Sequence, residues 1–174
     1  ICSNKEFIHE LIDVNHGAAM LLGPTMDAVK ANSILKNIRT LHVRMKQHSK
    51  NANFLAHKFT ELGIKTFYPG IKEHPCHKIM QKQKNEGFGC GGMLMIDVGS
   101  MKNAYDLMEE MQHEKIGYLA VSLGFYKTLF SAPGASTSSE IPEDEQKEMG
   151  LSEGFVRLSV GLDNDIERTF EKIK

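Results

Sequence analysis

Apolar residues recur every three or four positions over the first third of the chain, and this spacing predicts amphipathic helices. Ser3 lies three residues ahead of Glu6, which is the spacing of a capping box, so a helix is predicted over residues 4–14. A longer apolar stripe runs toward Gly63, a residue suited to end a helix. It predicts one long helix over residues 27–62, long enough to span two parts of a molecule.

Beyond that helix, short apolar runs with strand character alternate with helical stripes. Strands are expected at residues 66–68, 93–98, 118–124 and 154–161. Helices are expected after the possible N-cap Ser100, from Pro142, and after the predicted cap Asp163. Helices followed by strands alternating with helices indicate an α/β or α+β sandwich with about four short strands.

Composition and charge narrow the class of protein. The chain has 174 residues, 41% hydrophobic and 25% charged, which is ordinary for a globular domain. A formal net charge of -1 gives no electrostatic reason to expect nucleic acid or an anionic membrane as partner. No apolar run approaches the roughly 18 residues that span a bilayer. Three widely spaced cysteines favour a reducing compartment, so a cytoplasmic protein is expected.

The most informative strand is 154–161, whose centre carries Arg157. Val156, Leu158 and Val160 alternate with it and predict an apolar face on the opposite side. A buried guanidinium needs an anion or water, and its planar fork of donors suits a carboxylate. The strand alone leaves two readings open. Arg157 either pairs with an Asp or Glu of the chain or binds a carboxylate ligand.

Two patterns that suggest cofactor or metal sites are rejected. His74, Cys76 and His77 lack a second ligand pair at zinc-site spacing, and Pro75 indicates a loop. Residues 87–92 match G-x-G-x-x-G, but a strand pattern follows where a dinucleotide site needs a helix. These glycines are expected to allow tight turns at a strand entrance.

The remaining candidates are small hydroxyl residues. Ser122 ends a predicted strand, where its hydroxyl serves either a turn or a ligand. Residues 131–140 are small and polar, so they form either a flexible linker or an ordered pocket loop.

Five motifs, in order over about 150 residues, resemble those of the Cys/Met-metabolism pyridoxal-phosphate enzymes. They are LHVRM at 41–45, YPG with HPCH at 68–77, GCGGM at 89–93, AVSLG at 120–124 and GLSEGFVRLSVG at 150–161. Each motif is modest, but their shared order and spacing make a chance match improbable. The likeness is greatest to members that cleave methionine, with those that cleave or make cystathionine close behind.

The resemblance implies the C-terminal small domain of a fold-type I pyridoxal-phosphate enzyme, with a small, mostly antiparallel sheet covered by helices. Residues 1–26 would be the remnant of the large cofactor-binding domain, residues 27–62 the linking helix and residues 63–174 the small domain. The implied reaction is cleavage of the C–S bond of L-methionine or a related sulfur amino acid to a thiol, ammonia and a 2-oxo acid. A homotetramer is implied for the parent enzyme.

The resemblance also implies site residues. The family arginine that matches Arg157 holds the substrate's α-carboxylate, and the serine that matches Ser122 lies beside that carboxylate. The threonine that matches Thr137 lines the same pocket. Many members have MTH where residues 136–138 read STS, so the exact substrate stays open.

The family's cofactor-binding lysine precedes the motif at 41–45, and no matching motif is found in this sequence. No lysine is therefore assigned as the Schiff-base residue, and no residue is assigned to bind pyridoxal 5'-phosphate. The chain is expected to be the C-terminal portion of a larger enzyme, to be inactive alone and to bind no cofactor alone. Cystathionine cleavage or synthesis, and a free-standing non-catalytic binding or regulatory domain, are the alternatives.

Overall fold

The computed structural model describes residues 4–134, 136 and 140–174. The chain divides into two compact units, residues 1–41 and 42–174, and each is considered by itself. Within the described residues, no helix combines the length and apolar character that a membrane span requires.

Over its described residues, 4–41, the first unit holds the helices α1 (Lys5–Ile12), α2 (Ala18–Leu22) and α3 (Ala28–Ile38). The helix predicted over 4–14 is confirmed, although its N-cap is Asn4, whose Oδ1 accepts the backbone N–H of Phe7 at 2.8 Å. Asp27 caps α3 in the same way, accepting from Lys30 N at 2.9 Å. Side-chain oxygens thus satisfy N–H groups that the first turn of a helix leaves free.

The continuous helix predicted over residues 27–62 is interrupted. Helix α3 ends at Ile38, and α4 (Leu41–Glu61) begins after a turn at residues 39–40. The Thr40 hydroxyl donates to the carbonyl oxygen of Asn37 at 3.3 Å, and such local bonds compete with the helical ladder. Apolar periodicity predicted the helical faces on both sides of the turn but carried no signal of the break.

The second unit is built on a five-stranded sheet. Its strands are β1 (Lys65–Phe67), β2 (Met93–Asp97), β3 (Gly117–Leu119), β4 (Thr128–Ser131) and β5 (Phe155–Ser159). Their order in the sheet is β1-β2-β5-β4-β3. Every neighbouring pair is antiparallel except β3–β4, which is parallel. The mostly antiparallel sheet predicted from the sequence is confirmed, with five strands rather than about four.

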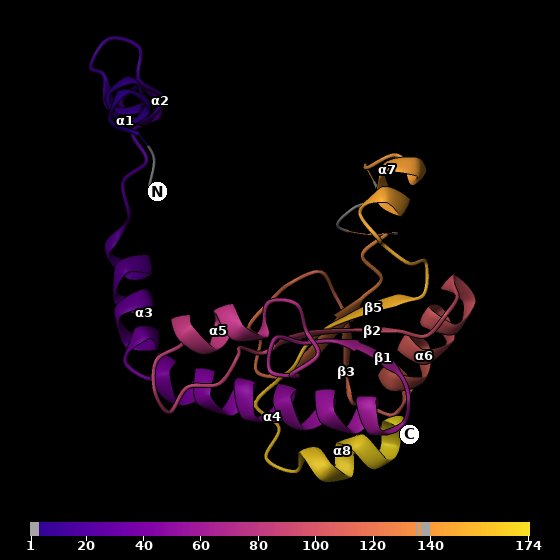
Figure 1. Ribbon diagram of the computed structural model, residues 1–174. Helices are drawn as coiled ribbons and strands as arrows, with labels where there is room; N and C mark the ends of the chain where they lie inside the picture. Colours follow the sequence, from indigo (N-terminus) through magenta and orange to yellow (C-terminus); the bar gives the residue numbers. More distant parts are fainter. Residues whose placement is uncertain (1–3, 135, 137–139) are drawn as a thin grey trace. The chain divides into compact units, whose positions relative to one another are not determined.

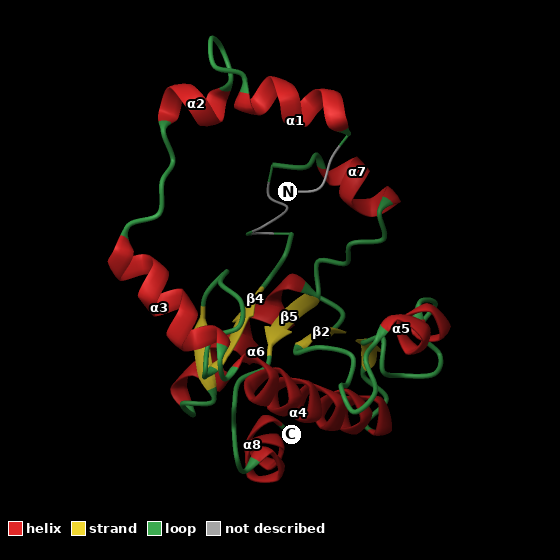
Figure 2. Ribbon diagram, turned by 90° about the vertical axis from the view of Figure 1, so that its left-hand side faces the viewer, coloured by secondary structure: helices red, strands yellow, loops and turns green. Residues whose placement is uncertain are grey.

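Helices α4, α6 (Met101–His113) and α8 (Ile166–Ile173) bury their apolar faces in the core of this unit. The shorter helices are α5 (His77–Gln83) and α7 (Glu143–Glu148). Figures 1 and 2 both place α4 and α8 on one side of the sheet and α7 on the other. The core therefore lies between the sheet and α4, and its largest fully buried side chains include Phe59, Phe130, Ile96 and Leu158.

Two predicted boundaries move. The strand expected over 118–124 covers only Gly117–Leu119, so Ser122 lies in the loop that follows it. The cap of α8 is Asp165, which accepts from Arg168 N at 3.3 Å, whereas Asp163 Oδ1 accepts from Asp165 N at 2.8 Å. Asp163 thus shapes the turn that precedes the helix, a role that Asp also favours.

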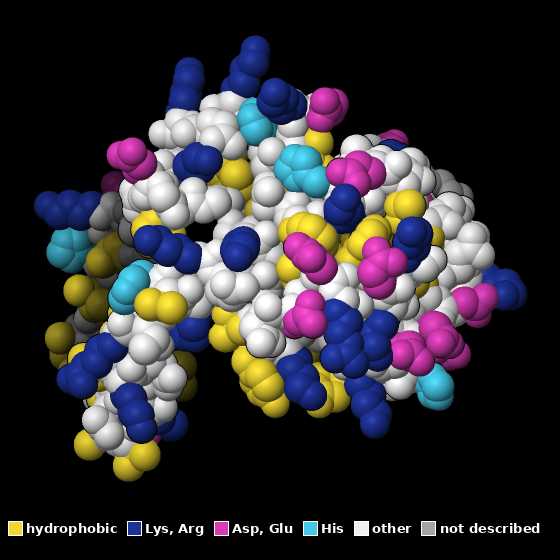
Figure 3. Space-filling model, turned by 90° about the horizontal axis from the view of Figure 1, so that it is seen from below, with side chains coloured by type: hydrophobic (Ala, Val, Ile, Leu, Met, Phe, Trp, Pro, Cys, Tyr) yellow, Lys and Arg dark blue, Asp and Glu magenta, His cyan; other side chains and the backbone are white. Residues whose placement is uncertain are grey.

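Charges of both signs mix on the face of α4 and α8 (Figure 3). Lys58 pairs with Glu61 at 2.6 Å on α4, and Lys172 of α8 pairs with Glu114 at 2.9 Å. The glycine run before β2 begins with a turn at residues 86–87, as predicted, where Gly87 has a positive φ of 73° that glycine adopts without strain.

Candidate anion-binding site on the sheet face opposite the core

Arg157 lies at the middle of β5, and β5 lies at the middle of the sheet. Its neighbours Val156 and Leu158 are fully buried and belong to the core. Because successive strand residues point to opposite faces, Arg157 projects from the face away from the core. The strand register places it opposite Met95 of β2 and Ser131 of β4. The sequence pattern had predicted this alternation.

Arg157 and its β4 partner Ser131 each have a buried polar atom without a hydrogen-bond partner among the described residues. These atoms are Nε of Arg157 and Oγ of Ser131. The described part of the chain also contains no ion pair for the Arg157 guanidinium. Unpaired buried donors are rare and costly in folded proteins, so each needs a specific reason. A bound anion would supply partners for both.

Ser122 reaches the same region through its loop. The residue is exposed, and Gly124, two positions on, donates its backbone N–H to Ser159 Oγ at 3.1 Å. Ser159 is two residues from Arg157 and therefore shares its face of the sheet. This bond holds the Ser122 loop against the Arg157 face, and no direct contact between Ser122 and Arg157 is observed within the described residues.

A pocket of about 340 Å³ joins the two predicted segments. Its lining includes residues 119–121, just before Ser122, together with Ser131, Ala132 and Ser136. The Ser136 hydroxyl donates to the Ala132 carbonyl at 2.7 Å, which folds this segment back on itself. Thr137, the third predicted site residue, lies outside the described residues. The pocket is completed by Tyr105 and Met108 of α6 and does not include Arg157, whose strand meets it only through the pairing of Arg157 with Ser131.

Ser131 was not predicted as a site residue. It is 3% exposed and ends β4 directly opposite Arg157. The signal available from the sequence was its place at the start of the small polar segment 131–140, read there as a linker or a pocket loop. Which strand pairs with 154–161, and in what register, could not be read from that segment.

The His74–His77 segment forms local bonds of its own. The Cys76 backbone N–H donates to His74 Nδ1 at 3.1 Å, and His77 Nδ1 lies 2.8 Å from the Pro69 carbonyl oxygen. Bonds of this kind orient the rings within their own loop.

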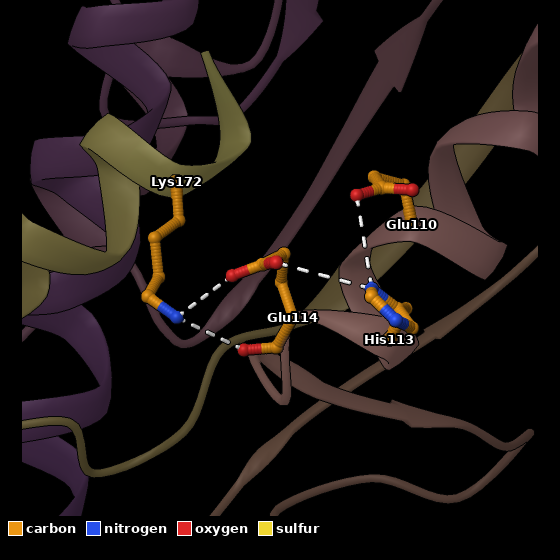
Figure 4. A network of polar contacts seen from close by, with 4 residues as sticks. All are labelled: Glu110, His113, Glu114 and Lys172. Atoms are coloured by element: carbon orange, nitrogen blue, oxygen red, sulfur yellow. Dashed lines mark hydrogen bonds and ion pairs between the residues drawn. The ribbon is translucent and has the colours of Figure 1, made fainter.

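A different group of side chains, Glu110, His113 and Glu114, has ligand atoms within 4.8 Å of one another. Figure 4 shows that Lys172 points into this group. Its ammonium lies 2.9 Å from Glu114 Oε2 and 3.2 Å from the Glu114 carbonyl oxygen. The hydrogen bond from Lys172, followed by the charge of Lys172, lowers the pKa of Glu114. The cluster is therefore a surface ion-pair network joining α6 to α8, already neutralised by a cation of the chain.

The fold is shared with solved structures of lyases. An O-acetylhomoserine (thiol)-lyase from Campylobacter jejuni, described as putative and carrying a pyridoxyl-lysine phosphate, superimposes with a TM-score of 0.70 at 28% identity. The match covers 79% of this chain and 34% of that one. The structure is thus a domain of a fold-type I pyridoxal-phosphate (PLP) enzyme, as the sequence predicted.

The family assignment follows from the sequence comparisons. The family model for Cys/Met metabolism PLP-dependent enzymes matches residues 1–171, and the chain belongs to this family. A methionine gamma-lyase from Arabidopsis thaliana is 38% identical over 175 residues, covering 100% of this chain and 40% of the relative. A cystathionine gamma-lyase from Bacillus subtilis is 32% identical over 176 residues, covering 99% and 43%. The chain therefore spans about two fifths of the length of these relatives.

The buried Nε–H of Arg157 and hydroxyl of Ser131, on the sheet face opposite the core, are donors that suit a carboxylate. We assign no side chain of this chain to hold PLP itself.

Proposed function

We propose that this chain is the C-terminal portion of a PLP-dependent lyase that cleaves the C–S bond of L-methionine or a related sulfur amino acid. The products are a thiol, ammonia and a 2-oxo acid. The observation that carries the proposal is the buried Nε of Arg157, which has no partner among the described residues. The 38% sequence identity with a methionine gamma-lyase, over 100% of this chain, supports the substrate class.

In this proposal, Arg157 binds the α-carboxylate of the substrate. A guanidinium binds a carboxylate through parallel hydrogen bonds and so fixes its plane as well as its position. Fixing the carboxylate restricts rotation about the substrate's Cα and holds the Cα–H bond in the orientation from which the proton leaves. When bound, PLP supplies the electron sink for the charge left at Cα. Ser122 and Thr137 are the proposed positioning residues beside the carboxylate.

The proposed division of the chain follows the family's architecture. Residues 1–26 would belong to the large domain, residues 27–62 would link the domains, and residues 63–174 would form the small domain. The division of the structure into units at residues 41 and 42 falls within the proposed linking segment.

We also propose that the parent enzyme is a cytoplasmic homotetramer. The segment around Ser122 exposes large apolar side chains that an assembled enzyme would cover: Tyr118, Leu119, Val121, Leu123, Phe125 and Tyr126. Cys76 and Cys90 are free, in keeping with a reducing compartment.

Cleavage of cystathionine is the second candidate, favoured by the 32% identity with a cystathionine gamma-lyase. Both reactions need the same carboxylate clamp, so the clamp does not separate them. The two reactions are separated by measuring thiol release from methionine and turnover of cystathionine in the full-length enzyme. Negligible thiol release from methionine would overturn the methionine assignment and leave the cystathionine reaction.

The test of the clamp is Arg157→Ala in the full-length enzyme. Losing the charged partner of a buried carboxylate costs about 2–5 kcal/mol, so KM should rise by about 30-fold or more. Arg168→Ala is the matched control, because this substitution removes the same charge from an exposed position on α8. An unchanged KM in Arg157→Ala would assign the residue a structural role only.

A further inference from the structure

We propose that Ser131 is a second hydrogen-bond donor to the substrate's carboxylate, beside Arg157. This inference rests on the function proposed above and extends it to a residue that the sequence did not single out. The carboxylate would then be bound by donors from two neighbouring strands, Ser131 on β4 and Arg157 on β5.

The strand register brings the two donors together. Ser131 is the direct partner of Arg157 in the antiparallel pair β4–β5. Directly opposed residues of such a pair have Cβ atoms about 5 Å apart and point to the same face. Phe130, the preceding residue, is fully buried in the core, so Ser131 projects from the opposite face, as Arg157 does.

Ser131 and Arg157 both have a donor that needs an acceptor from a third group. Both Ser131 Oγ and Arg157 Nε are buried, and neither bonds to the other or to another group among the described residues. Nε–H can only donate, and the hydroxyl has one proton to donate. A carboxylate has two oxygens with about four acceptor positions, so one ligand can accept from both.

One cavity reaches the Ser131 side of the pair. Ser131 lines a pocket of about 340 Å³ together with Tyr105 and Met108 of α6 and the segment just before Ser122. Arg157 does not line this pocket, so the pocket approaches the proposed carboxylate position from β4 alone.

A purely structural role for Ser131 makes a different prediction. A hydroxyl that only fills space can be replaced by hydrogen or by sulfur with no effect on ligand affinity. Because Oγ has no partner in the described structure, Ser131→Ala should leave the thermal midpoint of the ligand-free enzyme unchanged or raise it. Affinity, and not stability, is therefore the deciding measurement.

The experiment measures the Kd of L-norleucine for the holoenzyme by calorimetry. Norleucine matches methionine in length but has no C–S bond to cleave. Loss of one hydrogen bond to a charged group should weaken its binding about tenfold in Ser131→Ala. Ser131→Cys keeps the side-chain volume but donates weakly, so it should weaken binding similarly. Pentan-1-amine, which is norleucine without the carboxylate, should bind wild type and Ser131→Ala equally.

Ser49→Ala is the matched control. Ser49 is also a buried serine, but its Oγ accepts the backbone N–H of Gly91 at 3.2 Å on the core side. It should lower the thermal midpoint and leave the Kd of norleucine unchanged.

The outcomes separate this inference from the function on which it rests. Unchanged norleucine affinity in Ser131→Ala, with weakened affinity in Arg157→Ala, would overturn the role of Ser131 and leave the clamp intact. Unchanged affinity in both variants would overturn both. Normal affinity in Ser131→Cys with loss in Ser131→Ala would assign the effect to volume and overturn the hydrogen bond.

Discussion

Gly124 donates its backbone N–H to the hydroxyl of Ser159 at 3.1 Å, which ties the loop of Ser122 to strand β5. The two residues are 35 positions apart, and the bond is part-buried. Gly124 has a positive φ of 68°, a conformation that glycine adopts readily, so the loop can turn back onto the sheet here. Ser159 is 4% exposed and shares the face of Arg157. The position of Ser122 therefore depends on a hydroxyl of the strand that carries the proposed clamp.

Removing that hydroxyl should loosen the loop. In the full-length enzyme, Ser159→Ala should raise KM several-fold through misplacement of Ser122 and cost about 1 kcal/mol of unfolding free energy. Ser100→Ala is the control, since Ser100 Oγ accepts Asn103 N at 3.2 Å as the cap of α6. It should cost about 1 kcal/mol and leave KM unchanged. Equal KM values in Ser159→Ala and Ser100→Ala would show that the bond between Gly124 and Ser159 has no effect on substrate binding.

Replacing Arg157 by lysine tests geometry apart from charge. Lysine keeps the positive charge but loses the buried Nε–H and the planar fork. Arg157→Lys should therefore raise KM by about tenfold, less than Arg157→Ala, as measured by steady-state kinetics of the full-length enzyme. Arg168→Lys on the exposed face of α8 should have no effect. Full rescue by lysine would mean that charge alone suffices.

The core strand beneath the site should be sensitive to lost volume. Leu158 is fully buried against the core helices, so Leu158→Ala should lower the free energy of unfolding by about 2–5 kcal/mol. Denaturant unfolding of the 174-residue chain measures this. Leu62→Ala, at a side chain 46% exposed, should change it by less than about 0.5 kcal/mol. Similar values for both variants would contradict the packing described for β5.

Tyr68 should make the fold sensitive to alkali. Burial raises the pKa of Tyr68, outweighing the opposite effect of its hydrogen bond with Ser49. A group whose pKa is higher in the folded state retains its proton there while the unfolded chain loses it. Its contribution to stability is therefore complete below about pH 10 and is lost as the pH rises above that value.

Tyr68→Phe provides the comparison, since it removes the ionisable hydroxyl and the 3.0 Å bond to the Gly91 carbonyl. It should cost about 1 kcal/mol near neutral pH and reduce the further loss of stability between pH 9 and 11, measured by thermal unfolding. Tyr105→Phe is the matched control, because it removes the hydroxyl of an exposed tyrosine on α6. Parallel curves for wild type and Tyr68→Phe would contradict this linkage.

Local patterns predicted elements better than boundaries. Alternation around Arg157 was sufficient to place its side chain opposite the core, and Ser100 was correctly expected to cap the following helix. The break at residues 39–40 and the transfer of the α8 cap to Asp165 were missed. Asp163 and Asp165 offer the same carboxylate, so residue type could not tell which one caps α8, and the apolar periodicity across residues 39–40 carried no signal of the break.

By itself, the sequence determined the family, the alternation of strands and helices, and the place of an arginine at the centre of an otherwise apolar strand. Those features depend on residue type and on spacing within single elements. Only the tertiary structure decided that β4 lies beside β5 in the register that pairs Ser131 with Arg157. It alone also tied the Ser122 loop to Ser159. Such pairings join residues far apart in the chain, and they are set by packing of the whole sheet on its helices, which no local pattern encodes.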